Sequence, residues 1–174
     1  MQKLKTALLI IDVQNDFCDQ GTLAVPKAND VIPVINNLRT SLSFSVIYMV
    51  SDWHPIDHIS FASNHAGRKP FETILLPNGK QETLWPNHCV QNQAGSYFHK
   101  DLIRKDNDII IRKGKISDVN SYSGFGTSPE DSGLEKDLRS KGIQKIFVVG
   151  LALDFCVKDT ALDGVDKGYC IYIY

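Results

Sequence analysis

The chain has 174 residues, of which 43% are hydrophobic and 22% are charged, the proportions of an ordinary globular protein with a core of its own. Its formal net charge is −1, so it lacks the basic field with which proteins hold nucleic acid or an acidic membrane. No apolar run approaches a membrane span and no signal-peptide cleavage site follows the N-terminus, so we predict a single domain over residues 1–174 that binds neither nucleic acid nor membrane.

The predicted elements alternate between strand and helix. The first apolar run, Leu8 to Ile11, is typical of a parallel strand buried on both faces. Apolar residues at helical spacing predict a helix over about residues 30–43, and a second buried strand follows at 46–50. The alternation resumes with a strand at 109–111, a helix around 134–138 that stops near Gly142, a strand at 146–149, a helix at about 154–167 and a last strand from Cys170.

The stretch between about residues 53 and 105 is different. It is rich in Pro, Asn, Gly, His and Gln and shows no sustained period, so it predicts no regular structure. A stretch of this length without regular structure is uncommon inside a compact domain and usually serves the function.

The alternation of strand and helix predicts βαβ units with right-handed crossovers. The expected fold is therefore α/β, with three α/β/α layers and a mainly parallel sheet. Ligands of such sheets bind beyond the carboxyl ends of the strands. Four chemically useful residues lie at or just past the ends of four different predicted strands, and we expect them to meet there: Asp12, Asp52, Lys113 and Cys156.

Cys156 is the candidate nucleophile. It follows a strand and a small-residue turn and precedes a helix, where the helix dipole and free N–H groups favour a thiolate. A neutral thiol needs a base, and Asp12 can take its proton while Lys113 stabilises both charges. The alternatives are a buried packing cysteine, a turn carboxylate and a solvated lysine. Their shared position at one edge of one sheet favours catalysis.

A candidate metal site follows the second strand. Asp52 and His54 are two residues apart, so in an extended chain both side chains leave the same face. His88, in the long irregular stretch, can close the site from the other side. Two histidines and an aspartate suit Zn²⁺, with Fe²⁺ or Mn²⁺ as alternatives. An Asp-x-His pair is also found in polar turns that bind no metal.

Five motifs, spread over nearly the whole chain, carry a family resemblance. The sequence closely resembles the nicotinamidases of the isochorismatase-like cysteine hydrolases, and the motifs occur in the family's order. They are Asp12-Val13-Gln14-Asn15-Asp16-Phe17, Asp52-Trp53-His54-Pro55, Trp85-Pro86-Asn87-His88-Cys89, Arg112-Lys113-Gly114 and Gly150-Leu151-Ala152-Leu153-Asp154-Phe155-Cys156-Val157.

The resemblance implies that Asp12, Lys113 and Cys156 form the family's catalytic triad. The reaction would be hydrolysis of nicotinamide to nicotinic acid and ammonia through a cysteine thioester, as a step of NAD salvage. Backbone N–H groups of Ala152 and Cys156 would hold the oxyanion, and the peptide bond between Leu151 and Ala152 would be cis. Asp12 would serve first as base and then as acid.

The resemblance also assigns the metal and the substrate pocket. Asp52, His54 and His88 would hold one divalent ion, most simply Zn²⁺, which binds the ring nitrogen of nicotinamide. The aromatic side chains expected to flank the flat ring are Phe17, Trp85 and Phe155, with Phe155 able to point into the sheet instead and Tyr122 as a further lining residue.

The other histidines and cysteines have weaker assignments. We expect His58 to be an outer residue of the metal site or a surface residue, and His65 and His99 to be exposed. Cys89 is expected to serve packing. The four cysteines show no C-x-x-C pair and no disulfide-like density, so we expect free thiols in a reducing cytoplasm.

The last residues depart from the family pattern. The chain stops inside a predicted strand, so we expect either a fragment or a reduced C-terminal layer. Two alternatives to the nicotinamidase interpretation stay open, namely another isochorismatase-like amidohydrolase and a truncated member without catalysis. The metal set argues against the metal-free branch of the family, and the sequence leaves open whether copies of the chain form a homo-oligomer.

Overall fold

The computed structural model describes residues 4–76 and 79–174. A five-stranded sheet forms its centre, with the strands in the order β5-β2-β1-β6-β7. All neighbouring strands of this sheet run parallel, which confirms the predicted α/β class. The strands are β1 (Thr6–Ile11), β2 (Val46–Asp52), β5 (Ile109–Lys113), β6 (Lys145–Gly150) and β7 (Cys170–Ile173).

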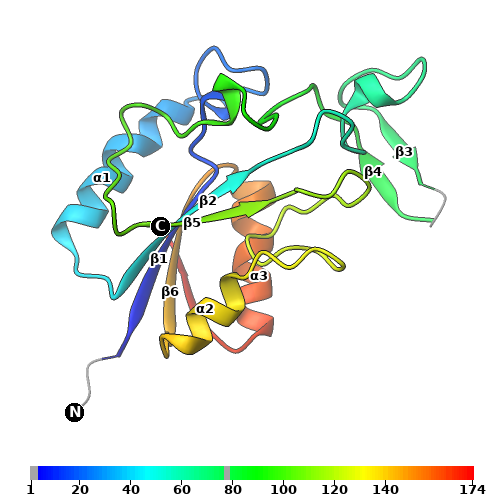
Figure 1. The fold of residues 1–174 in the computed structure, drawn as a ribbon. Coiled ribbons are helices and arrows are strands. Elements are labelled where there is room, and N and C mark those ends of the chain that lie inside the picture. The colour runs from blue at the N-terminus through cyan, green and yellow to red at the C-terminus, as the bar shows by residue number, and fades with distance from the viewer. Residues whose placement is uncertain (1–3, 77–78) are drawn as a thin grey trace.

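Helices cover both faces of the sheet (Figure 1). One face carries α1 (Val31–Ser41), and the other carries α2 (Leu134–Ser140) and α3 (Lys158–Asp166). Successive residues of a strand point to opposite faces, so Leu8 packs in the α1 core while Leu9 packs in the α2 and α3 core. Both side chains are fully buried, which explains why β1 reads as an uninterrupted apolar run.

The structure corrects two predictions about the secondary structure. The helix expected at about 154–167 begins with a wider π-helical turn, Leu153–Val157, before α3 starts. The stretch at 53–105 was predicted to hold no regular structure, and this was wrong. It contains a short antiparallel hairpin of β3 (Thr73–Leu75) and β4 (Gln81–Thr83), which extends away from the main sheet (Figure 1). None of the helices in the described ranges has the length and apolarity needed to cross a bilayer.

Candidate active site and metal centre

The carboxyl edge of the sheet brings the four predicted strand-end residues together. Asp12 directly follows β1, and its backbone N–H donates to the Val50 carbonyl of β2 at 3.0 Å. Asp52 and Lys113 end β2 and β5 and are paired across the two strands. Cys156 lies in the π-helical turn after β6. Strand pairing, set by the apolar runs, therefore places these side chains at one edge.

Lys113 is the centre of this group, and its side chain is fully buried. Its Nζ lies 3.0 Å from Oδ2 of Asp12 and 3.3 Å from Sγ of Cys156, and it also donates to Oδ1 of Asp52. Burial opposes a charged lysine, but Asp12 and Asp52 outweigh it and hold the pKa of Lys113 well above its ordinary value. The ammonium ion thus links the candidate triad to a candidate metal ligand.

The two carboxylates beside Lys113 titrate very differently. Burial, reinforced by the charge of Asp52 and opposed by Lys113, raises the pKa of Asp12 to about 7. For Asp52 burial acts in the same upward direction, but Lys113 and His54 outweigh it, and the pKa lies well below the ordinary value. Asp12 is therefore the group of this site that can gain and lose a proton near neutral pH.

The electrostatics of Cys156 correct one expectation. The helix position was predicted to favour a thiolate, but burial dominates and raises the pKa of the thiol well above its ordinary value, although Lys113 opposes this. The resting group is therefore a thiol that needs a base. The Asp12 carboxylate interacts with the Cys156 thiol as well as with Lys113, so it is placed to take that proton.

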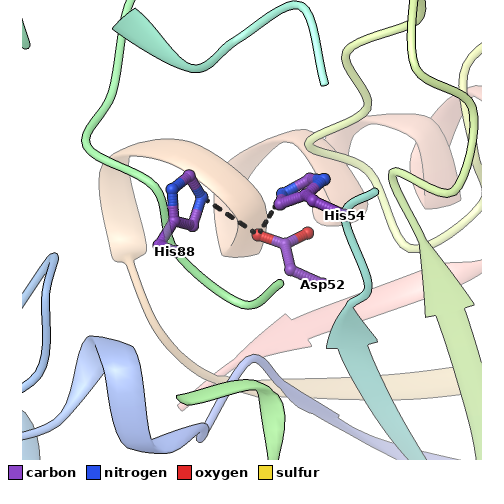
Figure 2. A group of neighbouring side chains, drawn as sticks. All are labelled: Asp52, His54 and His88. Carbon is purple, nitrogen blue, oxygen red and sulfur yellow. Dashed lines mark ion pairs between the residues drawn. The ribbon is translucent and has the colours of Figure 1, made fainter. Parts of the chain in front are cut away.

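Asp52, His54 and His88 form a buried cluster whose ligand atoms all lie within 4.8 Å of one another. Figure 2 shows both imidazole rings directed at the Asp52 carboxylate. The Nε2 atoms of His54 and His88 lie 3.4 and 3.9 Å from Oδ2 of Asp52. The structure therefore unites two residues from the end of β2 with one from the long loop segment.

Backbone carbonyls orient both histidines for metal binding. Nδ1 of His54 lies 2.9 Å from the Gly114 carbonyl, and Nδ1 of His88 lies 2.8 Å from the Pro86 carbonyl. A carbonyl only accepts, so each Nδ1 donates to it, and each Nε2 is the nitrogen that faces Asp52 and can bind an ion. Burial lowers the pKa of His88 to about 4, which keeps its ring neutral. This donor set fits a divalent ion such as Zn²⁺.

His58 lies beside this cluster, but both of its ring nitrogens already have other partners. It is fully buried, and its ring centroid lies 4.2 Å from that of His54, so it takes the expected place beside the metal cluster and not the alternative place on the surface. Its Nδ1 lies 2.7 Å from Oγ of Ser60, and its Nε2 lies 3.2 Å from the Val119 carbonyl. With both nitrogens engaged, His58 packs against a candidate ligand and is not itself one.

Two further histidines were predicted to be exposed, and this was also wrong. His65 and His99 are both half-buried. Nε2 of His65 lies 2.6 Å from the Ile59 carbonyl, so the ring ties its own loop together. Cys89 is buried within the core that contains α1, as expected for a packing residue.

An aromatic pocket of about 220 Å³ opens onto Cys156 and the metal cluster. Trp85 donates from Nε1 to the Tyr122 hydroxyl at 3.0 Å, and its ring meets the Phe155 ring edge-on at 5.2 Å between centroids. Phe155 therefore lines the pocket, while it also packs against the core that contains α2, and Phe17 lines the pocket as well. A larger groove of about 730 Å³ contains none of the triad or cluster residues.

The expected oxyanion position has the predicted backbone. The Leu151–Ala152 peptide bond is cis, and Ala152 and Cys156 both line the aromatic pocket. Cys156 lies in the first turn of its helix, near the positive end of the helix dipole. These positions are suited to hold a developing negative charge on a substrate oxygen.

Sequence reasoning missed residues that support the site through the main chain. Gln14 is fully buried, accepts from the Asp52 N–H and donates to the Asp52 and Ser96 carbonyls, each at 2.8 Å. Asp16 accepts from the Cys89 N–H at 2.7 Å, next to His88. The only sign of Gln14 and Asp16 in the sequence was that both belong to the Asp12–Phe17 motif.

The chain is similar to known proteins over nearly its whole length. A family model described as Isochorismatase domain matches residues 6–174. The nicotinamidase of Acinetobacter baylyi is 45% identical over 169 residues, which cover 96% of this chain and 78% of that protein.

Two solved structures agree with this relationship. An Acinetobacter baumanii nicotinamidase shares 44% identity and a TM-score of 0.89, over 97% of this chain and 81% of that one. A Pyrococcus horikoshii pyrazinamidase, solved in complex with zinc, shares 32% identity and a TM-score of 0.77, over 97% and 83% of the two chains.

Proposed function

The chain belongs to the isochorismatase family, and from this membership and its site we propose that it is a nicotinamidase, which hydrolyses nicotinamide to nicotinic acid and ammonia in NAD salvage. The observation that carries the proposal is the arrangement of the pocket. Cys156, with Sγ 3.3 Å from Nζ of Lys113, lies in the same small aromatic pocket as the Asp52, His54 and His88 cluster. The four free cysteines support the further proposal that the protein works in the reducing cytoplasm.

The pocket is suited to a flat heteroaromatic amide. Phe17, Trp85 and Phe155 offer apolar walls to the ring. Asp52, His54 and His88 would hold the divalent ion, for which zinc is our first choice and iron or manganese the alternatives. When bound, the ion would supply a Lewis acid for the ring nitrogen. The aromatic walls orient the ring so that its amide carbon faces Cys156, which lowers the entropic part of the barrier.

The first half of the reaction forms a thioester. Asp12 takes the proton from the Cys156 thiol as the sulfur attacks the amide carbon. The N–H groups of Ala152 and Cys156 stabilise the oxyanion that forms on the carbonyl oxygen. Asp12 then gives its proton to the amide nitrogen, the carbon–nitrogen bond breaks, and ammonia leaves.

The second half releases the acid. A water molecule takes the place of ammonia, and Asp12 removes one of its protons as the oxygen attacks the thioester carbon. The carbon–sulfur bond breaks, nicotinic acid leaves, and Asp12 returns its proton to the sulfur. Lys113 remains charged throughout, and it stabilises the thiolate and the ionised Asp12 in turn. A pKa of about 7 at Asp12 suits a group that acts as base and acid in one cycle.

Ammonia release from nicotinamide by the zinc-loaded protein tests this function. We expect the wild type to release ammonia and Cys156→Ala to lose at least about 10⁴-fold in rate. Cys170→Ala, which changes an exposed cysteine on β7, is the matched control and is expected to keep wild-type activity. A folded, metal-loaded wild type without ammonia release would refute the function, and equal rates in the two variants would refute the mechanism.

A further inference from the structure

Glu130 is a buried acid that the mechanism does not use. Only 5% of its surface is exposed, and it lies in the loop before α2, outside the five sequence motifs. Its Oε2 accepts from the Gly114 N–H and its Oε1 from the Lys115 N–H, both at 2.9 Å. Both oxygens of one buried carboxylate thus hold two consecutive peptide groups, an arrangement with strong and directional hydrogen bonds.

The turn that Glu130 holds lies against a candidate metal ligand. Gly114 has a φ of +65°, and a Cβ atom there would lie 2.3 Å from Cε1 of His54. Only glycine therefore lets the turn approach this imidazole ring so closely. From this position the Gly114 carbonyl accepts from Nδ1 of His54. The turn also begins directly after Lys113, whose carbonyl accepts from the Trp53 N–H at 2.9 Å.

We propose that Glu130 is a positioning residue for the metal centre: by holding the turn at residues 114–115, it aims the Gly114 carbonyl at Nδ1 of His54 and so presents Nε2 to the ion. The proposal rests on the metal site of the proposed function. Partners that orient a metal-bound histidine in this way contribute about 10- to 100-fold to metal affinity. Glu130 acts here through a peptide group, without touching the ion or the substrate.

Zinc affinity of the stripped protein, measured by competition with a chromogenic chelator, tests the proposal. Glu130→Gln keeps the size of the side chain but turns an NH₂ group toward one of the two N–H donors. We expect zinc to bind this variant about 10- to 100-fold more weakly than the wild type. Glu135→Gln removes a more exposed carboxylate that pairs with Arg139 and Lys167, and it is expected to bind zinc within twofold of the wild type.

A second readout addresses His54 directly. Long-range ¹H–¹⁵N spectra of the zinc-free wild type are expected to show His54 protonated on Nδ1, and Glu130→Gln is expected to lose this single tautomer. Raising the zinc concentration is expected to restore the activity of Glu130→Gln. These binding and tautomer measurements need no substrate, so they remain decisive even if the wild type does not hydrolyse nicotinamide.

Several results would overturn the role of Glu130. Two concern the variants: a folded Glu130→Gln variant that binds zinc as tightly as the wild type, or a Glu135→Gln variant that loses as much zinc affinity as Glu130→Gln. Two concern the wild type: no zinc binding, or His54 protonated on Nε2 instead of Nδ1 in the zinc-free protein. If Glu130→Gln fails to fold, the zinc affinity of Glu130→Asp is measured in its place. It keeps the charge but shortens the reach, so zinc is expected to bind it more weakly than the wild type, and unchanged affinity would equally overturn the proposal.

Discussion

The site is built from two regions that are held in place by different forces. The sheet edge supplies Asp12, Asp52 and Lys113, whose positions follow from strand pairing and from a core buried on both faces. The segment between β2 and β5 supplies His88 and Trp85 instead. It is fastened by individual hydrogen bonds, such as those from the His54 N–H to the Cys89 carbonyl and from the Gln91 N–H to the His54 carbonyl.

This difference separates two tasks of the site. The covalent chemistry is assigned to groups at the sheet edge and to Cys156 in the turn after β6, which share one buried charge network around Lys113. Orientation of the metal and the ring is assigned largely to the irregular segment. We therefore expect changes at the sheet edge to affect stability and chemistry together, and changes in the segment to affect mainly binding.

The largest effect is expected from Lys113→Met. This change leaves two neighbouring carboxylates buried without their cation, so we expect the free energy of unfolding to fall by about 3–5 kcal/mol and ammonia release to be lost. Urea unfolding followed by circular dichroism measures the first quantity. Lys141→Met, which breaks a much more exposed pair with Asp137 than those of Lys113, is the control and should change stability by no more than about 0.5 kcal/mol. Wild-type stability of Lys113→Met would contradict the shared network.

His88→Ala tests the segment. We expect zinc to bind this variant far more weakly, by more than the roughly 10- to 100-fold typical of losing an outer partner, because a direct ligand is lost. The zinc-free protein should lose no more than about 1–2 kcal/mol of stability, because the sheet is untouched. Chelator competition and urea unfolding measure the two quantities. His99→Ala, in the same segment but outside the cluster, should bind zinc as the wild type does. Wild-type zinc affinity in His88→Ala would refute the assignment of Asp52, His54 and His88 as the metal ligands.

Gln14→Leu tests the connection between the two regions. Gln14 binds the main chain of Asp52 on the sheet and the Ser96 carbonyl in the segment. Leaving these buried groups without partners should cost at least about 1–3 kcal/mol and weaken zinc binding about tenfold. The exposed side chain of Gln144 offers the control Gln144→Leu, which should change neither quantity. Unchanged zinc affinity in Gln14→Leu would show that Asp52 does not depend on this connection.

The pH dependence of kcat/KM tests the charge network at the sheet edge without changing any residue, and its expected effect is the smallest of the four. Asp12 acts as a base only when ionised, and its pKa is raised to about 7 by burial and by Asp52. Activity should therefore reach its plateau above this pKa and fall about tenfold for each pH unit below it. Initial rates on the zinc-loaded enzyme between pH 5 and 9 measure this. An acid limb near pH 4, the ordinary value for an aspartate, would contradict the raised pKa.

Much of the fold was predictable because hydrophobic periodicity is a local property. The uninterrupted apolar runs at Leu8 to Ile11 and at 46–50 indicated strands covered on both faces, and the structure confirms them. A parallel sheet then brings all its carboxyl ends to one edge, so the meeting of Asp12, Asp52, Lys113 and Cys156 followed from the order of the elements. The hairpin of β3 and β4 escaped prediction because its strands are three residues long and bury little.

The sequence by itself determined which groups stand at the sheet edge, and through its motifs it indicated that His88 and Trp85 join them. Only the tertiary structure decided how these groups are oriented and charged. The bonds from Gln14 to Asp52 and from Glu130 to Gly114 join residues 38 and 16 positions apart and leave no periodic trace in the chain. The proton on Cys156 likewise depends on burial and on neighbours contributed by other strands, because a pKa reflects the whole surroundings of a group and not its place in the sequence.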